Sequence, residues 1–264
     1  MDISVAAISV LSCNNAEEKA AKALQLAENW KNGVLPFQFT RTPSLRPARP
    51  DHPILLPPAD MPKRRKGGSI ANKIALLHAI AHIELNAIDL AFDIIARFGS
   101  SMPKDFTSDW IQVGADEAKH FNLLQERLKS LGSYYGALPA HDGLWESAQH
   151  TKDCLAARLA VVPMVLEARG LDVTPDMIKR LAKTGDTESV EILSIIYEEE
   201  ITHVAAGKRW FSYLCQQKNK NEESHFHDLV TAYFYGQLKP PFNKPARTKA
   251  GLTAGFYEPL VEFL

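Results

Sequence analysis

The chain has 264 residues, of which 45% are apolar and 23% charged, as is ordinary for a globular protein. Its formal net charge of −1 excludes a global attraction to nucleic acid or anionic membranes. No apolar run reaches the roughly 18 residues of a membrane span, and residues 1–4 lack the basic segment of a signal peptide. The three cysteines, Cys13, Cys154 and Cys215, are odd in number and have no metal-like spacing, which indicates reduced thiols and a cytoplasmic protein.

The N-terminal region predicts a helix followed by an irregular strap. Residues 4–12 are apolar, and the next pattern predicts a helix over residues 16–31, capped by Asn14 or Asn15. Eight prolines in residues 34–68 exclude a regular helix or a central strand, so we expect an extended strap on the surface. The strap carries basic residues that could contact phosphates, with a solvated linker as the alternative: Arg41, Arg46, Arg49 and the run Lys63, Arg64, Arg65, Lys66.

Four longer helices follow in the predicted order. They are expected at about residues 69–98, 107–131, 146–169 and 187–217. A short connection makes the first two an antiparallel hairpin, and Ser69 caps the first of them. The irregular residues 132–146 are long enough to run back along a whole helix. Such a crossover between the second and third helices distinguishes a ferritin-like four-helix bundle from an up-down-up-down bundle.

The third long helix is expected to be interrupted. It should end near Gly170, after which Thr174 and Pro175 cap a short helix to about residue 183. Pro163 removes a backbone donor one turn before Glu167 and predicts a kink there.

The C-terminal region predicts a last helix over about residues 225–237 and an irregular tail. The apolar Phe256, Tyr257 and Leu260 indicate that the tail docks, and Asn243 and Arg247 are candidates for closing over one mouth of the bundle. The predicted fold class is therefore all-α, with residues 1–68, 69–217 and 218–264 forming one compact domain overall.

One ligand pattern occurs twice in the long helices. Each copy has a Glu-x-x-His motif and a lone glutamate 33 residues before the motif glutamate, and the second copy follows the first by 83 residues throughout. The copies are Glu84, Glu117, His120 and Glu167, Glu200, His203. Residues i and i+3 share a helix face, so each motif can reach one metal ion. Two copies of this arrangement are what a four-helix bundle uses to hold two metal ions.

The glutamates occupy positions on the apolar stripes of their helices. An uncompensated ionised carboxylate in a core is prohibitive, so these groups must be paired or bound to metal. Four carboxylates and two divalent ions cancel in charge. We therefore predict two ions about 3.5–4 Å apart, bridged by Glu117 and Glu200. The remaining ligands are then Glu84 and His120 on one ion and Glu167 and His203 on the other.

Several other polar residues have two readings. His78 and His82 share a helix face remote from Glu84, which favours a structural role over metal ligation. His141 could serve proton delivery or substrate contact, or simply loop packing. Tyr197, three residues before Glu200, could orient a ligand or act as a redox-active phenol.

The stretches ADEAKHFNLLQERL, PAHDGLWE, EEEITHVAAGKRWF and LKPPFN resemble an uncharacterised bacterial family of the ferritin-like superfamily, nearly throughout the chain from residue 15. More distantly, the chain is similar to carboxylate-bridged di-iron enzymes and tRNA-modifying hydroxylases. This resemblance implies a di-iron or iron–manganese centre held by the six residues of the repeated pattern. It also implies crosswise contacts of Asp116 with His203 and of Glu199 with His120, since histidine ligands usually donate their second N–H to a carboxylate.

Three functions remain open at this point. Carboxylate-rich ligation favours iron and an oxygen-activating oxidase or hydroxylase, with dioxygen, an external reductant and a small molecule or modified nucleoside as substrate. A ferroxidase or iron-handling protein is the second hypothesis. The third is a non-enzymatic module with a structural metal, whose basic strap binds RNA or a protein.

Overall fold

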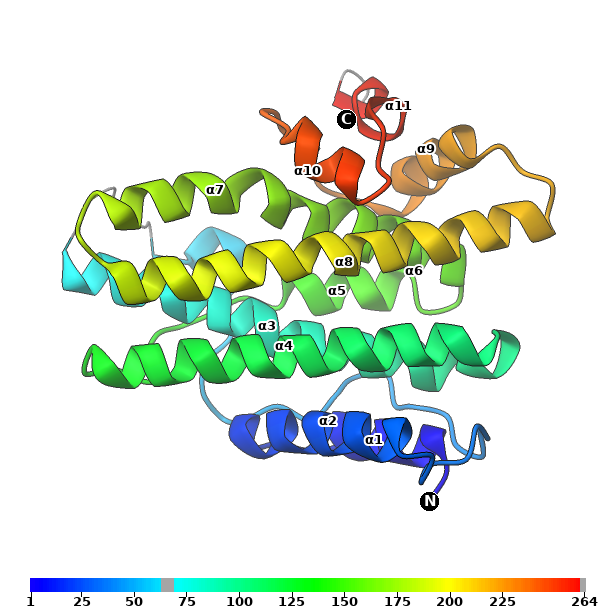
Figure 1. Cartoon of the computed structure of the whole chain (residues 1–264), viewed down its shortest axis with the longest axis horizontal. Coiled ribbons are helices and arrows are strands. Elements are labelled where there is room, and N and C mark those ends of the chain that lie inside the picture. The colour runs from blue at the N-terminus through cyan, green and yellow to red at the C-terminus, as the bar shows by residue number, and fades with distance from the viewer. Residues whose placement is uncertain (63–68, 262–264) are drawn as a thin grey trace. The chain divides into compact units, whose positions relative to one another are not determined.

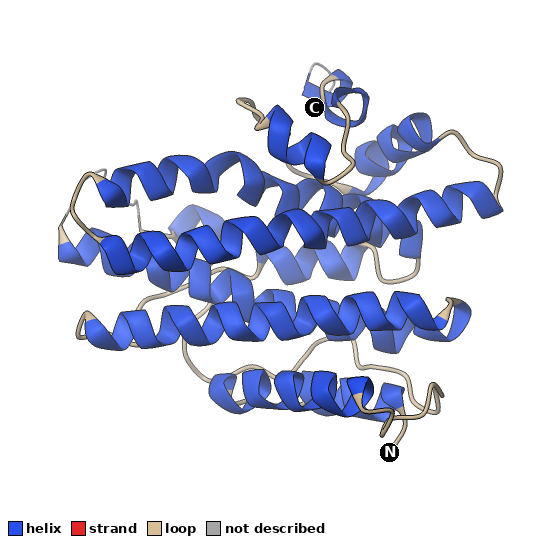
Figure 2. Ribbon diagram, viewed as in Figure 1, coloured by secondary structure: helices blue, strands red, loops and turns tan. Residues whose placement is uncertain are grey.

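The structure, a computed structural model, describes residues 1–62 and 69–261. Regular structure in these residues is helical apart from one isolated β-bridge between Leu55 and Ala140, which confirms the all-α class (Figure 2). The chain forms two compact units, residues 1–145 and residues 146–264. The three-part division expected from the sequence stays a prediction.

The first unit is built on a hairpin of two long helices, α3 (Ile70–Phe98) and α4 (Lys104–Ser130) (Figure 1). A 3-10 turn, Gly99–Ser101, joins them. α2 (Ala16–Lys31) packs on α4, and α1 (Ile3–Leu11) packs on α3 and α2.

Local signals explain where these helices begin. Asn15, and not Asn14, caps α2 by accepting the backbone N–H of Glu18, and Ser69 caps α3 by accepting that of Asn72. α4 begins at Lys104, three residues before its predicted start, directly after Pro103. The stretch Ile70–Ser101 is long and apolar enough to cross a membrane by composition, but 67% of its most apolar window is buried inside the structure.

The proline-rich strap lies on the surface of the first unit, as predicted. Its backbone is hydrogen-bonded to α1, where Ile3 N–H donates to Pro36 O over 3.2 Å. It is also hydrogen-bonded to the loop after α4, where Leu56 N–H donates to Ala140 O over 2.8 Å. Arg46 of the strap forms an ion pair with Asp142 of the same unit. The basic run of residues 63–66 lies outside the described residues.

The predicted helix over residues 146–169 is wrong in its bounds. The structure has α5 (Gly143–His150) and α6 (Leu155–Val161), separated by a turn. α6 then continues through a π-helical segment, Val162–Glu167, here called the π turn, into α7 (Ala168–Ala182). α8 (Thr187–Gln217) packs against this composite helix and has the predicted bounds.

Gly170 does not end the helix, and Pro175 lies inside α7. A proline within a helix removes the N–H that would bond to the carbonyl four residues earlier. Here that carbonyl belongs to Leu171, and it accepts a hydrogen bond of 3.0 Å from Asn243 Nδ2 in the tail. The tail thus supplies the donor that Pro175 lacks, which no local pattern could show.

The C-terminal elements are α9 (Glu222–Tyr233), α10 (Lys244–Lys249), α11 (Ala254–Tyr257) and the 3-10 turn Pro259–Val261. α9 begins earlier than predicted because Asn221 caps it, accepting the N–H of Ser224. It also ends earlier, at Tyr233, where Phe234 is extended. The docking of the tail is confirmed, since the exposed fractions of three apolar side chains are 4%, 1% and 3%: Phe256, Tyr257 and Leu260.

Candidate metal centre

Three buried side chains on α3 and α4 form the candidate site of the first unit. Glu84 projects from α3, and Glu117 and His120 lie one turn apart on α4; none is more than 2% exposed. The two helices approach closely because α4 has a glycine nearby. A β-carbon built at Gly114 would lie 2.7 Å from the Phe92 ring of α3.

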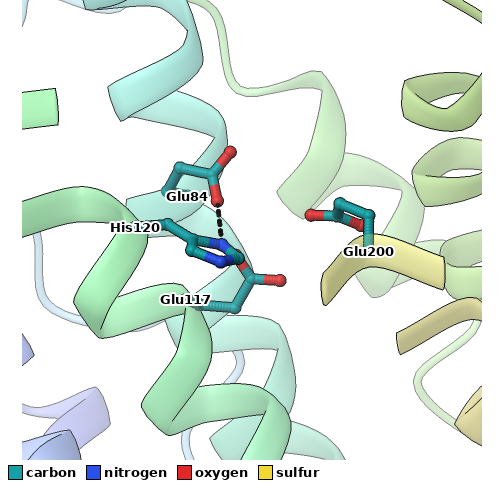
Figure 3. Close-up of side chains that lie close together, drawn as sticks. All are labelled: Glu84, Glu117, His120 and Glu200. Carbon is teal, nitrogen blue, oxygen red and sulfur yellow. Dashed lines mark hydrogen bonds and ion pairs between the residues drawn. The ribbon is translucent and has the colours of Figure 1, made fainter. Parts of the chain in front are cut away.

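His120 lies between the two carboxylates (Figure 3). Its Nδ1 is 3.0 Å from Glu84 Oε2 and 3.5 Å from Glu117 Oε2. The potential ligand atoms of these three residues lie within 4.8 Å of one another. One ion could therefore contact all three. Glu200, also labelled in Figure 3, belongs to the second unit.

Burial and mutual contact perturb these groups strongly. Burial, and next the charge of Glu117, hold the pKa of Glu84 well above its usual range. Burial alone would lower the pKa of His120, but hydrogen bonds with Glu117 and Glu84, together with the charges of these carboxylates, outweigh it and raise the pKa to about 11. At neutral pH a metal ion must therefore displace a proton from this cluster.

The donor set of this cluster fits a metal ion. Two carboxylates and one imidazole are side chains that ligate divalent metal ions in proteins. Buried carboxylates of this kind need a counter-charge, which a divalent ion supplies more fully than a single proton does. Glu84, Glu117 and His120 would hold the ion.

The second unit places the other copy of the pattern on two packed segments. Glu167 is the last residue of the π turn and is half-buried. Glu200 and His203 lie on α8, with His203 Nδ1 3.8 Å from Glu200 Oε1. The side chain of His203 is 1% exposed and that of Glu200 12%. These three residues, here called the second half-site, are as a set more exposed than Glu84, Glu117 and His120, here called the first half-site.

The acidic residues before the motif glutamates have local contacts. Asp116 Oδ1 accepts from Gln112 Nε2 over 3.1 Å and lies 3.5 Å from Lys119 Nζ. Glu199 is half-buried on α8. The crosswise contacts of Asp116 with His203 and of Glu199 with His120 join the two units and stay predictions.

The structural reading of His78 and His82 is confirmed. Burial lowers the pKa of His78 to about 4, and its Nε2 accepts the backbone N–H of Gly136 over 2.9 Å. Burial also lowers the pKa of His82 to about 3; its Nε2 lies 3.1 Å from the carbonyl oxygen of His141, and its Nδ1 lies 2.8 Å from Tyr135 Oη. His141 thus packs the loop through its backbone while its ring is exposed.

Tyr197 and the tail form a second polar cluster, in the second unit. Tyr197 Oη is 2.9 Å from Asn243 Nδ2, and Asn243 N–H donates to Asp172 Oδ1 over 2.9 Å. Arg247 Nη2 pairs with Asp172 Oδ2 at 2.7 Å, with both side chains at most 3% exposed. Asn243 and Arg247 therefore bind α7 and α8 of their own unit.

Sequence reasoning missed one buried charge cluster in the first unit. Lys19 of α2 pairs with Asp89 of α3, both fully buried, and Arg49 of the strap adds a contact of 3.2 Å to Asp89. The available signal was a lysine on the apolar face formed by Ala23 and Leu26.

Fold and site together define an all-helical protein with a buried carboxylate–histidine cluster able to bind metal. The chain belongs to the family described as "Protein of unknown function (DUF455)", which matches residues 12–258. It is 38% identical over 257 residues to a Haemophilus influenzae protein described as an uncharacterized protein, covering 92% of this chain and 88% of that relative. No solved structure matched the chain.

Proposed function

We propose that the protein is a ferritin-like di-metal protein whose two half-sites together hold two ions, either two irons or iron with manganese. The ligands are those of the repeated pattern: Glu84, Glu117, His120, Glu167, Glu200 and His203. The observation that carries the proposal is the buried cluster of two carboxylates and one imidazole in the first unit, whose ligand atoms lie within 4.8 Å of one another.

The repetition of the pattern supports a second, matching half. Each unit pairs a helix bearing a lone glutamate with a neighbouring helix bearing Glu-x-x-His: α3 with α4, and the π turn with α8. The proposal requires these halves to meet as in a four-helix bundle. Four glutamates and two divalent ions are then neutral as a group, which offsets the cost of burying the carboxylates.

We propose an oxygen-activating oxidase or hydroxylase as the activity. Bound iron would supply reduction of dioxygen coupled to oxidation of an organic substrate, a small molecule or a modified nucleoside, with an external reductant. The protein residues would hold the ions with open positions and exclude bulk water. The raised pKa of His120 identifies a proton that the first half-site holds until metal binds.

Two cations of the strap that were candidates for RNA binding are paired with acidic or amide side chains of the protein. Arg46 is paired with Asp142, and Arg49 with Asp89 and Asn86, within the first unit. These guanidinium groups are therefore already committed to protein partners, which lowers their availability for phosphates.

Metal analysis tests the proposal. After loading with Fe(II) without oxygen and removal of free metal, the wild-type protein should hold two ions per chain, and Glu167→Ala one or fewer. Glu198→Ala is the matched control, because that neighbouring glutamate is 62% exposed and pairs with Lys249; it should keep two. One ion or none in the wild type would overturn the proposal. Oxygen consumption by the Fe(II) form, with and without a reductant and candidate substrates, then separates an oxidase from a ferroxidase.

A further inference from the structure

The helix that carries Glu167 changes its winding just before this residue. The π turn spans Val162–Glu167, and the N–H of Ala168 has the carbonyl oxygen of Pro163, five residues back, among its acceptors. Pro163 has no N–H and cannot continue α-helical bonding to Leu159. A π turn adds one residue to the helix, which rotates the following side chains by about 100° relative to the preceding ones.

α8 has a notch facing this turn. A β-carbon built at Gly207 would lie 2.5 Å from both Cβ and Cγ of Pro163, closer than real β-carbons approach other atoms. The proline ring therefore occupies space that only a glycine at position 207 leaves free. Both residues are buried, so the ring cannot swing into solvent.

The notch lies on the ligand-bearing face of α8. Gly207 follows His203 by four residues and Glu200 by seven, so the three share one face of the helix. Pro163 precedes Glu167 by four residues. The composite helix and α8 are consecutive and joined by a short turn, so they run antiparallel. Because Pro163 lies one turn before Glu167 and Gly207 lies one turn after His203, the contact between Pro163 and Gly207 places Glu167 at the level of His203.

We propose that Pro163 and Gly207 are positioning residues that lock the π turn against α8 and so hold Glu167 level with Glu200 and His203. The inference rests on the proposed function, because it concerns how the second half-site is assembled. The lock fixes both the height and the rotation of the Glu167 segment, and neither residue contacts the metal.

Titration of the full chain with Co(II) tests the lock, with absorption reporting the coordination of each ion. The wild type should bind two ions. Gly207→Ala should bind one unchanged and the other about 10–100-fold more weakly, with an altered spectrum for that ion. The matched control is Gly170→Ala, three residues beyond Glu167 in α7, where a β-carbon would meet nothing within 4 Å. It should bind both ions as the wild type does.

A second variant keeps the test decisive if Gly207→Ala fails to fold. Pro163→Ala adds no clash and restores an N–H for Leu159, so the π turn can rewind as an α-helix. In the metal-free protein, hydrogen exchange at Ala168 should change, and the same ion should bind more weakly. A role in packing alone would lower the melting temperature without changing either readout.

The outcomes separate this inference from the function on which it rests. A wild type that binds fewer than two ions overturns both. A wild type that binds two ions while Gly207→Ala and Pro163→Ala bind two with unchanged affinity and spectra overturns the lock alone.

Discussion

The two half-sites share one ligand pattern but are built differently. In the first unit, Glu84 and Glu117 project from two regular α-helices, and His120 contacts both carboxylates within 3.5 Å. In the second unit, Glu167 ends a π turn, and His203 lies 3.8 Å from Glu200. The same spacing of residues is thus carried by two regular α-helices in one unit and by a π turn beside an α-helix in the other.

The difference lies in what holds each half-site together. A glycine of the Glu-x-x-His helix lets the neighbouring helix approach in both units: Gly114 against Phe92 and Gly207 against Pro163. Both units also hold a buried aspartate five residues beyond the lone glutamate. Lys19 and Arg49 contact Asp89 in the first unit, and Arg247 and Asn243 contact Asp172 in the second. The partners differ, since they come from the N-terminal helix and strap in the first unit and from the C-terminal tail in the second.

Metal removal should give the largest effect. At free metal about 1,000 times Kd, binding stabilises a protein by about 4 kcal/mol, which for a chain of this size is roughly 8–16 °C in melting temperature. Differential scanning calorimetry of the loaded and metal-free forms at pH 7 measures this. Equal melting temperatures would contradict the proposed site.

The metal-free protein should also lose stability as pH rises. The pKa values of Glu84 and His120 in the folded protein lie above the ordinary 4.5 and 6.5. The folded state therefore keeps these protons bound to a higher pH than the unfolded chain does. Their stabilising contribution is full below about pH 4.5 for Glu84 and 6.5 for His120. That of His120 is lost between pH 6.5 and about 11. Melting temperatures between pH 5 and 8 should fall less in Glu84→Gln than in the wild type. A wild type that gains stability over this range would refute the assignment to the first half-site.

Breaking the tail's buried ion pair should weaken the second unit selectively. Arg247→Met leaves the Asp172 carboxylate buried with its main charge partner gone, at a cost of about 3–5 kcal/mol. Arg169→Met is the control, because Arg169 is 41% exposed and 3.4 Å from the same carboxylate; its cost should be within about 1 kcal/mol. Urea unfolding monitored by hydrogen exchange in α3 and α7 measures both. Equal loss of protection in both helices would show that the tail supports the units alike.

A smaller loss of stability should follow from removing the side chain that bonds to the Leu171 carbonyl, which has no helical donor because of Pro175. Asn243→Ala removes the donor to Leu171 O and should cost about 1–3 kcal/mol. In a Pro175→Ala background the helix supplies its own N–H, so the same change should cost less. The comparison is a double-mutant cycle measured by urea unfolding, and a coupling energy of zero would contradict it.

Asp116→Asn tests the link between the halves with the smallest change. It keeps the size of the side chain and removes its charge. If Asp116 orients His203, metal affinity should fall about 10–100-fold while the fold is retained. Glu198→Gln, an exposed acid of α8, is the control. Unchanged affinity in Asp116→Asn would leave the six ligands in place and remove the crosswise contact.

Local signals predicted much of the fold. α2, α3 and α8 have the expected bounds because caps and apolar stripes are encoded within a few residues, as with Ser69 before α3. The closeness of Glu84, Glu117 and His120 also follows from the stripes of a predicted hairpin. Non-local contacts explain the errors. α7 passes through Gly170 and Pro175 because distant tail groups complete it.

The candidate site shows the same division. Spacing alone picked out the residues that cluster in the first unit. The missing N–H of Pro163 predicted a kink, but not a π turn, because the notch at Gly207 lies 44 residues further along the chain. Nor could it pair Lys19 with Asp89, which are 70 residues apart.

The hydrogen bond from Asn243 to the carbonyl of Leu171 affects the order in which the two units fold during translation. The two residues are 72 positions apart, so at about 5–20 residues per second the ribosome needs roughly 4–14 s to make the second after the first. During that interval the Leu171 carbonyl can bond only to water, and α7 must stay frayed at its middle turn. The first unit needs no such wait, because its hairpin is already synthesised. The nascent chain should therefore fold its first unit early and complete its second only near the end of translation, exposing the apolar face of α7 to chaperones in between.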